Sequence, residues 1–156
     1  MPSKTLSVAA IKNGTVIDHI PQGTALRILA LLNLTSYPKI ATVGLNLPSQ
    51  SMKRKDLIKL EDREITQEEA SQIAVFAPKA TMAIIRNYAV IKKIPLRIPD
   101  TVEHVFLCHN QNCVTNKDRM SSKFRIIQTG SSIHLECVYC ERMYSQDQMK
   151  NYIHDV

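Results

Sequence analysis

The sequence has few glycines and no long apolar run, and both shortages narrow the classes of protein to consider. No stretch approaches the roughly 20 consecutive apolar residues of a transmembrane helix. Only four glycines occur, and the phosphate-binding patterns G-x-x-x-x-G-K-S/T and G-x-G-x-x-G are both missing. The catalytic patterns G-x-S-x-G and H-E-x-x-H are missing as well. These absences argue against a membrane protein, the common nucleotide-binding folds and an active site confined to this chain.

The sequence also gives little support for a secreted protein or for a nucleic-acid-binding protein. The N-terminal residues Met1–Lys4 lack the apolar core of a signal peptide, so we expect a cytoplasmic protein. The formal net charge of +6 indicates an anionic partner. Aromatic residues make up only 5% of the chain, which leaves few side chains on which nucleic-acid bases could stack. We therefore expect neither a membrane nor a nucleic acid among the partners.

All four cysteines lie in the last third of the chain, in the pattern C-x4-C-x23-C-x2-C. Two short cysteine pairs joined by a hairpin-length insert predict one tetrahedral metal site, and four thiolates suit zinc best. Four protein ligands leave no open position for water or substrate, so the site is expected to be structural. Its folding should depend on the metal, because so small a β-rich segment buries little surface. The predicted ligands are Cys108, Cys113, Cys137 and Cys140.

Three alternatives remain open for this segment. Two disulfides are disfavoured by the reducing compartment expected for the chain. Cys137 and Cys140 have the C-x-x-C spacing of a redox motif, although the second cysteine pair argues against that use. A zinc-ribbon nucleic-acid-binding protein is the strongest rival, with basic residues Lys117, Arg119, Lys123 and Arg125 as its contacts.

Residue patterns in the first two thirds of the chain predict a mixture of strands and helices. Alternating apolar residues indicate strands at 5–11, 15–19, 40–47 and 55–60, with a hairpin turn at Asn13-Gly14. A helix is expected from Thr24 to about Leu34. The capping box of Thr66 and Glu69 predicts a second helix, which Pro78 ends. Residues 81–92 read as a long or broken strand.

The element order β-β-α-β-β-α-β predicts an α+β fold, in which a ferredoxin-like sheet carries two helices on one face. We assign residues 1–98 to this domain, and Pro95 and Pro99 mark a linker at its end. Residues 124–128 and 133–137 predict a hairpin that carries the second cysteine pair. Residues 99–156 are therefore expected to form a small β-rich, zinc-ribbon-like domain.

Charged side chains gather at the predicted strand ends of the first domain. Asp18 and His19 end one strand, Lys55 and Lys59 share one face of another, and Lys92 and Lys93 end the last. Ammonium groups could neutralise the phosphates of a polyphosphate ligand, while the carboxylate accepts from a ribose hydroxyl or a base amine. The alternative is that these are edge-strand lysines that discourage aggregation.

Five segments of the chain, together with the cysteine spacing, resemble the regulatory chain of aspartate carbamoyltransferase. The segments are Val8–Pro21 (VAAIKNGTVIDHIP), Val43–Ser49 (VGLNLPS), Lys53–Lys59 (KRKDLIK), Ala77–Thr81 (APKAT) and Asn87-Tyr88. The resemblance covers about residues 5 to 145. It implies a non-catalytic subunit of the enzyme that catalyses the first committed step of pyrimidine synthesis. Its N-terminal domain would bind CTP and ATP at one effector region, with UTP assisting, and pair with a second regulatory chain.

The resemblance also implies which residues carry these functions. The family's effector positions correspond to Val8, Ile11, Val16, Asp18, His19, Lys59, Ile85, Tyr88, Val90 and Lys93, with Lys55 nearby. In this scheme the lysines hold the triphosphate, Asp18 holds the ribose, and Ile11, Tyr88 and Val90 bracket the base. The chain departs from the family pattern at Ala9 and Ala83, near the base, where discrimination between purine and pyrimidine effectors is expected to change.

The zinc domain would dock on the catalytic chain of the same enzyme. The contacts are expected from the loop 109–112, with Asn110 and Asn112, and from Glu141 beside the second cysteine pair. A loop that is anchored at both ends by metal thiolates is preorganised, which lowers the entropy cost of docking. One structural zinc ion per chain would therefore serve assembly rather than chemistry.

Overall fold

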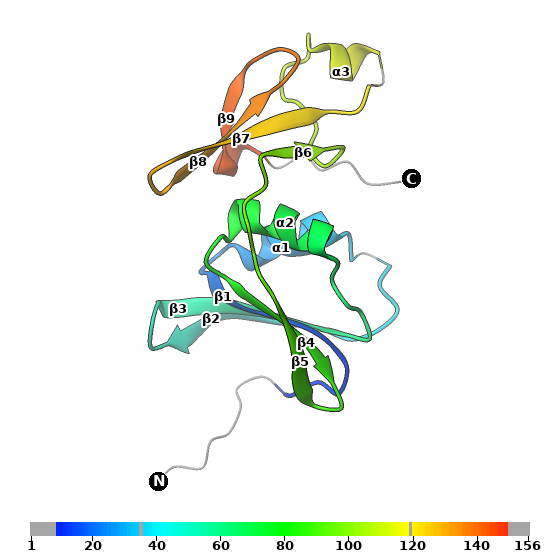
Figure 1. Cartoon of the computed structure of the whole chain (residues 1–156), viewed down its shortest axis with the longest axis vertical. Helices are drawn as coiled ribbons and strands as arrows, with labels where there is room; N and C mark the ends of the chain where they lie inside the picture. The colour runs from blue at the N-terminus through cyan, green and yellow to red at the C-terminus, as the bar shows by residue number, and fades with distance from the viewer. Residues whose placement is uncertain (1–8, 35, 119, 150–156) are drawn as a thin grey trace.

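A computed structural model of the chain describes residues 9–34, 36–118 and 120–149. Residues 14–94 form a five-stranded antiparallel sheet with the strand order β2-β3-β1-β4-β5, and two helices cover one face (Figure 1). The elements are β1 (Gly14–Pro21), α1 (Ala25–Leu32), β2 (Ala41–Ser49), β3 (Lys53–Glu61), α2 (Gln67–Phe76), β4 (Thr81–Arg86) and β5 (Ala89–Ile94). This is the split β-α-β arrangement of ferredoxin-like folds plus one edge strand, which confirms the predicted α+β class.

The hairpin predicted at Asn13-Gly14 is wrong. Residues 9–13 form no strand, and residues 5–8 of the predicted first strand lie outside the described part of the chain. Gly14 has φ +139°, and a Cβ atom there would lie 1.9 Å from the carbonyl oxygen of Leu60. The glycine is therefore needed because β1 begins in close contact with β3, and not because the chain turns back on itself.

The long or broken strand predicted at residues 81–92 is a hairpin, β4–β5, in the structure. Asn87 and Tyr88 form the turn with φ values of 50° and 64°. Positive φ at both central residues is the mark of a type I′ turn, whose twist matches that of the two strands. The Tyr88 amide donates to the Lys12 carbonyl at 2.9 Å, so a tertiary contact helps to hold this unusual backbone.

The N-terminus of α1 is capped from the sheet rather than by the predicted Thr24, whose side chain makes no capping hydrogen bond. One carboxylate oxygen of Asp56, on β3, accepts from the amides of Gly23 at 2.9 Å and Ala25 at 3.2 Å. The other oxygen accepts from the Asn46 amide at 2.9 Å, at a bulge in β2. Asp56 is fully buried, so three backbone donors depend on one carboxylate.

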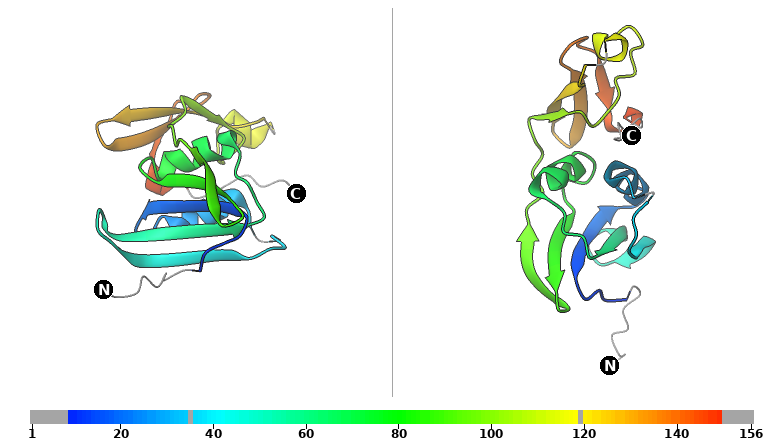
Figure 2. Two further views of the ribbon diagram at one scale, coloured as in Figure 1. Left: turned by 60° about the horizontal axis from the view of Figure 1, so that its bottom comes forward. Right: turned by 90° about the vertical axis from the view of Figure 1, so that its right-hand side faces the viewer.

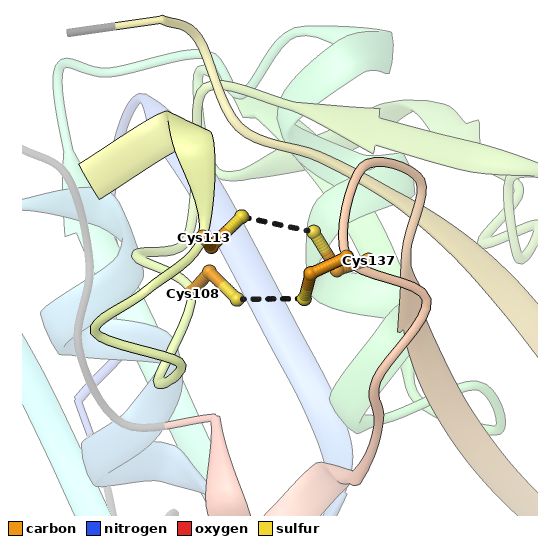
Figure 3. Close-up of side chains that lie close together, drawn as sticks. Cys108, Cys113 and Cys137 are labelled. Atoms are coloured by element: carbon orange, nitrogen blue, oxygen red, sulfur yellow. Dashed lines mark hydrogen bonds between the residues drawn. The ribbon is translucent and has the colours of Figure 1, made fainter. Parts of the chain in front are cut away.

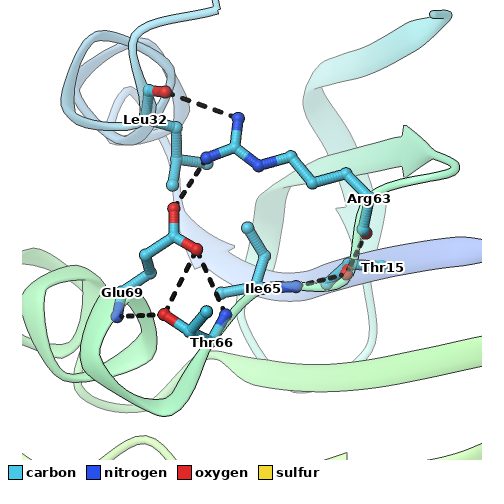
Figure 4. Close-up of polar contacts among 6 residues, drawn as sticks. All are labelled: Thr15, Leu32, Arg63, Ile65, Thr66 and Glu69. Carbon is cyan, nitrogen blue, oxygen red and sulfur yellow. Dashed lines mark hydrogen bonds and ion pairs between the residues drawn. The ribbon is translucent and has the colours of Figure 1, made fainter.

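Helix α2 begins with the predicted capping box, which is confirmed. The Glu69 amide donates to Thr66 Oγ1 at 3.1 Å, and the Thr66 amide donates to Glu69 Oε1 at 3.2 Å (Figure 4). Arg63 donates to Glu69 Oε2 at 2.6 Å and to the Leu32 carbonyl at 3.5 Å, so the same glutamate ties the start of α2 to the end of α1. The loop before α2 thereby fixes both helices on the sheet.

The second domain is a four-stranded antiparallel sheet with the strand order β6-β7-β8-β9 (Figure 2). Its elements are β6 (Thr101–Glu103), α3 (Val114–Lys117), β7 (Lys123–Thr129), β8 (Ser132–Cys137), β9 (Met143–Ser145) and the 3-10 helix η1 (Gln146–Gln148). The predicted hairpin is confirmed as β7–β8, which pairs from Phe124 with Cys137 to Thr129 with Ser132.

The two domains share part of a core. Val75 and Phe76, at the end of α2, belong to the apolar cluster of the second domain. The ring of Phe76 meets that of Phe106 edge-on, with centroids 5.7 Å apart. In Figures 1 and 2, α1 and α2 lie between the first sheet and the second domain. Among the described residues, no helix is both long and apolar enough to cross a membrane.

Candidate functional site

The four cysteine sulfur atoms converge on one point in the second domain. All lie within 4.8 Å of one another, and the Cys108–Cys140 and Cys113–Cys137 sulfur distances are both 3.7 Å (Figure 3). Four sulfurs placed tetrahedrally at about 2.3 Å from a zinc ion are about 3.8 Å apart. The donor set and its spacing therefore fit one tetrahedral metal ion.

Local backbone geometry positions each thiol. Cys113 is the N-cap of α3, and Cys137 is the last residue of β8. Glu141 follows Cys140 with φ 62°, and its amide donates to the Cys137 carbonyl at 2.8 Å, which closes the turn into β9. Asn116 donates from its side chain to the Cys108 and Asn110 carbonyls, both at 2.8 Å, and so shapes the loop between the first two ligands.

The surroundings of the thiols favour a bound cation. Burial raises the pKa of Cys108, and burial raises the pKa of Cys137 to about 12 despite backbone amides that point at its sulfur. Burial acts in the same direction on Cys140, but hydrogen bonds from the Arg142 amide and from Asn110 lower its pKa to about 7. Four thiolates this close repel one another, so a divalent cation is needed to hold them deprotonated together.

Two hydroxyl groups lie beside the thiols, and neither was predicted from the sequence. Thr115 Oγ1 lies 3.2 Å from the Cys113 sulfur, and the Tyr144 hydroxyl lies 3.5 Å from the Cys108 sulfur. The ring of His109 packs against Tyr144 with centroids 5.3 Å apart, and His109 is not part of the four-thiol cluster. The position of Thr115, two residues after Cys113, is the one feature of the sequence that could have indicated its contact with that thiol.

The residues predicted to dock on a partner lie around this centre. Asn112 and Glu141 are exposed, and Asn110 is half-buried, with its side chain accepting from the Asn112 amide at 3.0 Å. The structure therefore brings the loop 109–112 and Glu141 to the surface next to the thiols.

A second candidate site lies on the first sheet. We call the side of this sheet opposite α1 and α2 the outer face. The strand register places Lys59 next to Val16, Val16 next to Ala83, and Ala83 next to Lys93. Their neighbours in sequence (Ile17, Ile58, Met82 and Ile84) are buried on the helix side, so this row belongs to the outer face. Two predicted lysines thus share one face with Val16 between them.

The predicted Asp18 and His19 lie in a bulge of β1, where the register with β3 shifts between Ile17 and Ile20. The Asp18 carboxylate pairs with Lys55 at 2.8 Å, and His19 Nδ1 lies 3.0 Å from Thr81 Oγ1. Burial lowers the pKa of Lys59, while the nearby Asp18 carboxylate opposes that shift. The bulge thus brings one carboxylate, one imidazole and two ammonium groups together.

The segment before β1 lies against the same face. Lys59 Nζ donates to the Ala9 carbonyl at 2.9 Å, and Ile11 is buried. The Lys12 carbonyl accepts from the Tyr88 amide, which brings the segment beside the β4–β5 turn. Of the other predicted residues, Ile85 is buried, Tyr88 and Val90 are exposed, and Val8 lies outside the described residues.

Comparison with known proteins decides the family. Residues 6–97 match the aspartate carbamoyltransferase regulatory chain, allosteric domain, and residues 100–150 match the metal binding domain of the same chain. The aspartate carbamoyltransferase regulatory chain of Aliivibrio salmonicida is 47% identical over 148 residues, which cover 94% of this chain and 96% of the relative. That of Chromobacterium violaceum is 46% identical over 143 residues, covering 92% and 94%.

The chain belongs to the aspartate carbamoyltransferase regulatory chain family. Its role is therefore regulatory rather than catalytic, in accord with the missing catalytic motifs. The four thiols fall within the family's metal binding domain, and the outer face falls within its allosteric domain.

The structure supports neither of the two rival functions, a redox enzyme or a zinc-ribbon nucleic-acid-binding protein. Cys137 lies 3.7 Å from Cys113 in a four-thiol cluster rather than in an isolated redox pair. Lys123 and Arg125 form ion pairs with Glu103 and Glu136 on neighbouring strands. Arg119 lies outside the described residues. The basic residues of this domain are thus partly neutralised, which weakens the case for a surface along which a nucleic-acid backbone could run.

Proposed function

We propose that this protein is the allosteric subunit of aspartate carbamoyltransferase and that it binds CTP, ATP and UTP on the outer face to control pyrimidine biosynthesis. The observation that carries the proposal is the row from Lys59 through Val16 and Ala83 to Lys93, with Asp18 and Lys55 beside it. A nucleoside triphosphate needs cations, an acceptor for its ribose and an apolar surface for its base, and this face offers all three.

Each group has a distinct task in this proposal. Lys59 and Lys93 neutralise the triphosphate, and Asp18 accepts from the ribose hydroxyls, for which it exchanges its contact with Lys55. Val16 and Ile85 form the floor of the site. Ile11, Tyr88 and Val90 bracket the base, and Val8 and His19 complete the site. The short side chains of Ala9 and Ala83 leave extra room near the base, which sets the balance between purines and pyrimidines.

Control follows from linkage. A nucleotide shifts the equilibrium between two quaternary states of the holoenzyme only by the difference in its affinity for them. ATP and CTP share one triphosphate site, so opposite effects must arise where their bases differ, next to the strands β1 and β4. The direction of each effect is thus decided by contacts of the base rather than of the phosphates.

We further infer that one structural zinc ion per chain fills the four-thiol centre and that the surrounding surface docks on the catalytic chain. Four soft thiolates in a tetrahedral arrangement favour zinc over the oxygen-seeking divalent cations. Asn110, Asn112 and Glu141 then form the contacts, since the metal fixes the loops that present them. Reduced thiols of this kind are typical of the cytoplasm, where we place the protein.

The nucleotide site is tested by calorimetric titration of the metal-loaded chain with CTP, using two adjacent lysines. Lys93 pairs with Ala83 on the outer face, whereas Lys92 pairs with Ile84 on the helix side. Lys93→Ala is expected to weaken CTP binding about tenfold to a hundredfold, because one charge-assisted phosphate contact is lost. Lys92→Ala removes the same charge and is expected to leave the affinity within about twofold of wild type.

Lys59→Ala should act like Lys93→Ala, and ATP should displace CTP from the wild-type chain. Equal losses in Lys92→Ala and Lys93→Ala would mean that only net charge attracts the nucleotide. CTP binding that both Lys59→Ala and Lys93→Ala leave unchanged would overturn the site assignment.

The regulatory chain is also proposed to pair with a second copy through the edge strand β2. The residues of β2 carry no charge, and Ile40 and Leu45 are 63% and 48% exposed at this edge. The opposite edge strand, β5, exposes Lys92 and Lys93, which discourage strand pairing. Leu45→Lys is therefore expected to convert dimers to monomers in sedimentation velocity, with Lys92→Leu as the control at the other edge. A dimer that Leu45→Lys leaves intact would rule out β2.

A further inference from the structure

Arg27 reaches from α1 across to the second domain. Its Nη1 donates to the Gln146 carbonyl at 2.9 Å, and its Nη2 donates to the Asp147 carbonyl at 3.4 Å and lies 3.2 Å from the Asp147 carboxylate. One guanidinium group thus contacts three acceptors on two consecutive residues of η1. A side chain in the first turn of α1 therefore adds a polar bridge between the two domains, beside the core that they share at Val75 and Phe76.

The contact is completed from α2. The guanidinium carbon of Arg27 lies 5.9 Å from the ring centroid of Phe76, and the Gln146 side chain donates to the Val75 carbonyl. Gln146 is therefore held by both helices at once, and Asp147 by α1. A cavity of about 220 Å³ adjoins the contact and is lined by Gln22, Gly23, Thr24, Arg27, Phe76, Gln146 and Asp147.

The same end of α1 is tied to the strands of the outer face. Asp56 caps this helix through Gly23 and Ala25, and it follows Lys55 directly in β3. Asp56 also pairs with Ile20, immediately after the Asp18–His19 bulge, while Lys55 holds the Asp18 carboxylate. A ligand that draws Lys55 or Asp18 out of their ion pair therefore acts on the strand segment that anchors the helix.

We propose that the contact of Arg27 with residues 146 and 147 transmits nucleotide binding on the outer face to the second domain. We call this contact the latch, and the second domain the metal domain. This inference rests on the proposed nucleotide function and names how that site is coupled. The route runs from the β1 bulge to Asp56, through the first turn of α1 to Arg27, and from there to residues 146 and 147. Rearrangement of the Lys55–Asp18 pair shifts the capped end of α1, and Arg27 transfers the shift to the metal domain.

The contacts have the strength that such a latch requires. The side chain of Asp147 is 91% exposed, so its ion pair with Arg27 is weakened by water and salt. The carbonyl contacts are directional but few. A contact of this kind holds one arrangement and releases it when a ligand alters the balance, while the packing of Val75 and Phe76 keeps the two domains joined.

Hydrogen–deuterium exchange on the full metal-loaded chain, with and without saturating CTP, tests the latch. In the wild type, CTP is expected to change exchange both in β1 and β4, where it binds, and in residues 143–149. In Arg27→Gln, the change in β1 and β4 should persist while the response of residues 143–149 is lost. Arg125→Gln, which breaks an ion pair within the metal domain, is the control and should respond like the wild type.

The outcomes separate the two proposals. Protection of β1 and β4 together with an unaltered response of residues 143–149 in Arg27→Gln would overturn the latch and leave the nucleotide site standing. The latch is equally overturned if the wild type binds CTP with no change in residues 143–149. No CTP-dependent change anywhere in the wild type would overturn the nucleotide site, and the latch with it. Exchange in β1 and β4 without nucleotide also reports that Arg27→Gln remains folded.

Discussion

Removal of the metal is expected to unfold the second domain and to release the chain from its catalytic partner. Cys108, Cys113 and Cys137 are part of the second apolar cluster, so the thiols proposed to bind the metal also belong to the core. A structural zinc ion contributes about 10–16 kcal/mol of apparent binding free energy at neutral pH, which exceeds what so small a core supplies. The cluster includes Val75 and Phe76, so the end of α2 should also lose protection.

Hydrogen–deuterium exchange of the chain and sedimentation velocity of the holoenzyme are measured before and after chelation, and mass spectrometry follows the metal content. Amides of β7 and β8 should lose protection as metal leaves, whereas β1 and β3 should keep it. Cys137→Ser is expected to give the same result without a chelator. Tyr144→Phe removes only the hydroxyl beside Cys108 and should weaken metal binding about tenfold, as loss of an outer contact to a metal ligand does. A holoenzyme that stays assembled after complete metal extraction would contradict the docking role.

Two features that local sequence controls were predicted correctly. The capping box at Thr66 and the four-cysteine spacing each act within a few residues or one hairpin, and the structure contains both. The errors arise where a distant contact decides. Asn13-Gly14 carries a strong hairpin signal, yet Gly14 is required by the approach of Leu60, which lies far along the chain in β3. The turn at Asn87-Tyr88 lacks glycine and is held by Lys12.

The same distinction applies to the candidate sites. Lys55 and Lys59 share a face by strand parity alone, which the sequence reveals. Lys93 joins Lys59 on the outer face only through the register of three strand pairs, and the β4–β5 pairing contains a shift between Ile84 and Ile85. Arg27 gave no sequence signal, since its acceptors at residues 146 and 147 lie in another domain. Contacts of this kind follow from tertiary structure.

Asp56→Ala is expected to destabilise the allosteric domain by about 2–4 kcal/mol, because three backbone amide donors lose a buried carboxylate acceptor and one of these donors is itself buried. The donors are Gly23, Ala25 and Asn46. Ala25 is buried, so water cannot replace the carboxylate there, whereas Gly23 and Asn46 are exposed residues whose amides can bond to water instead. Such a loss is a large fraction of the stability of a typical domain, so the variant should unfold at a clearly lower denaturant concentration than the wild type. Chemical denaturation of the metal-loaded chain measures the change.

The matched substitutions Asp56→Asn and Asp62→Asn separate this role from a general effect of charge. Asp62 directly follows the same strand, where its carboxylate is half exposed and lies 3.8 Å from Lys39, so its loss should cost about 0.5 kcal/mol or less. Asp56→Asn keeps one acceptor oxygen but turns an amide group toward backbone donors, which forces either the α1 cap or the β2 bulge to open. Equal stability of Asp56→Asn and Asp62→Asn would show that the buried Asp56 carboxylate is dispensable and that other contacts hold the N-terminus of α1. A selective loss in Asp56→Asn would instead establish that a buried carboxylate on β3, the strand beneath the nucleotide face, anchors the first turn of the helix that carries Arg27.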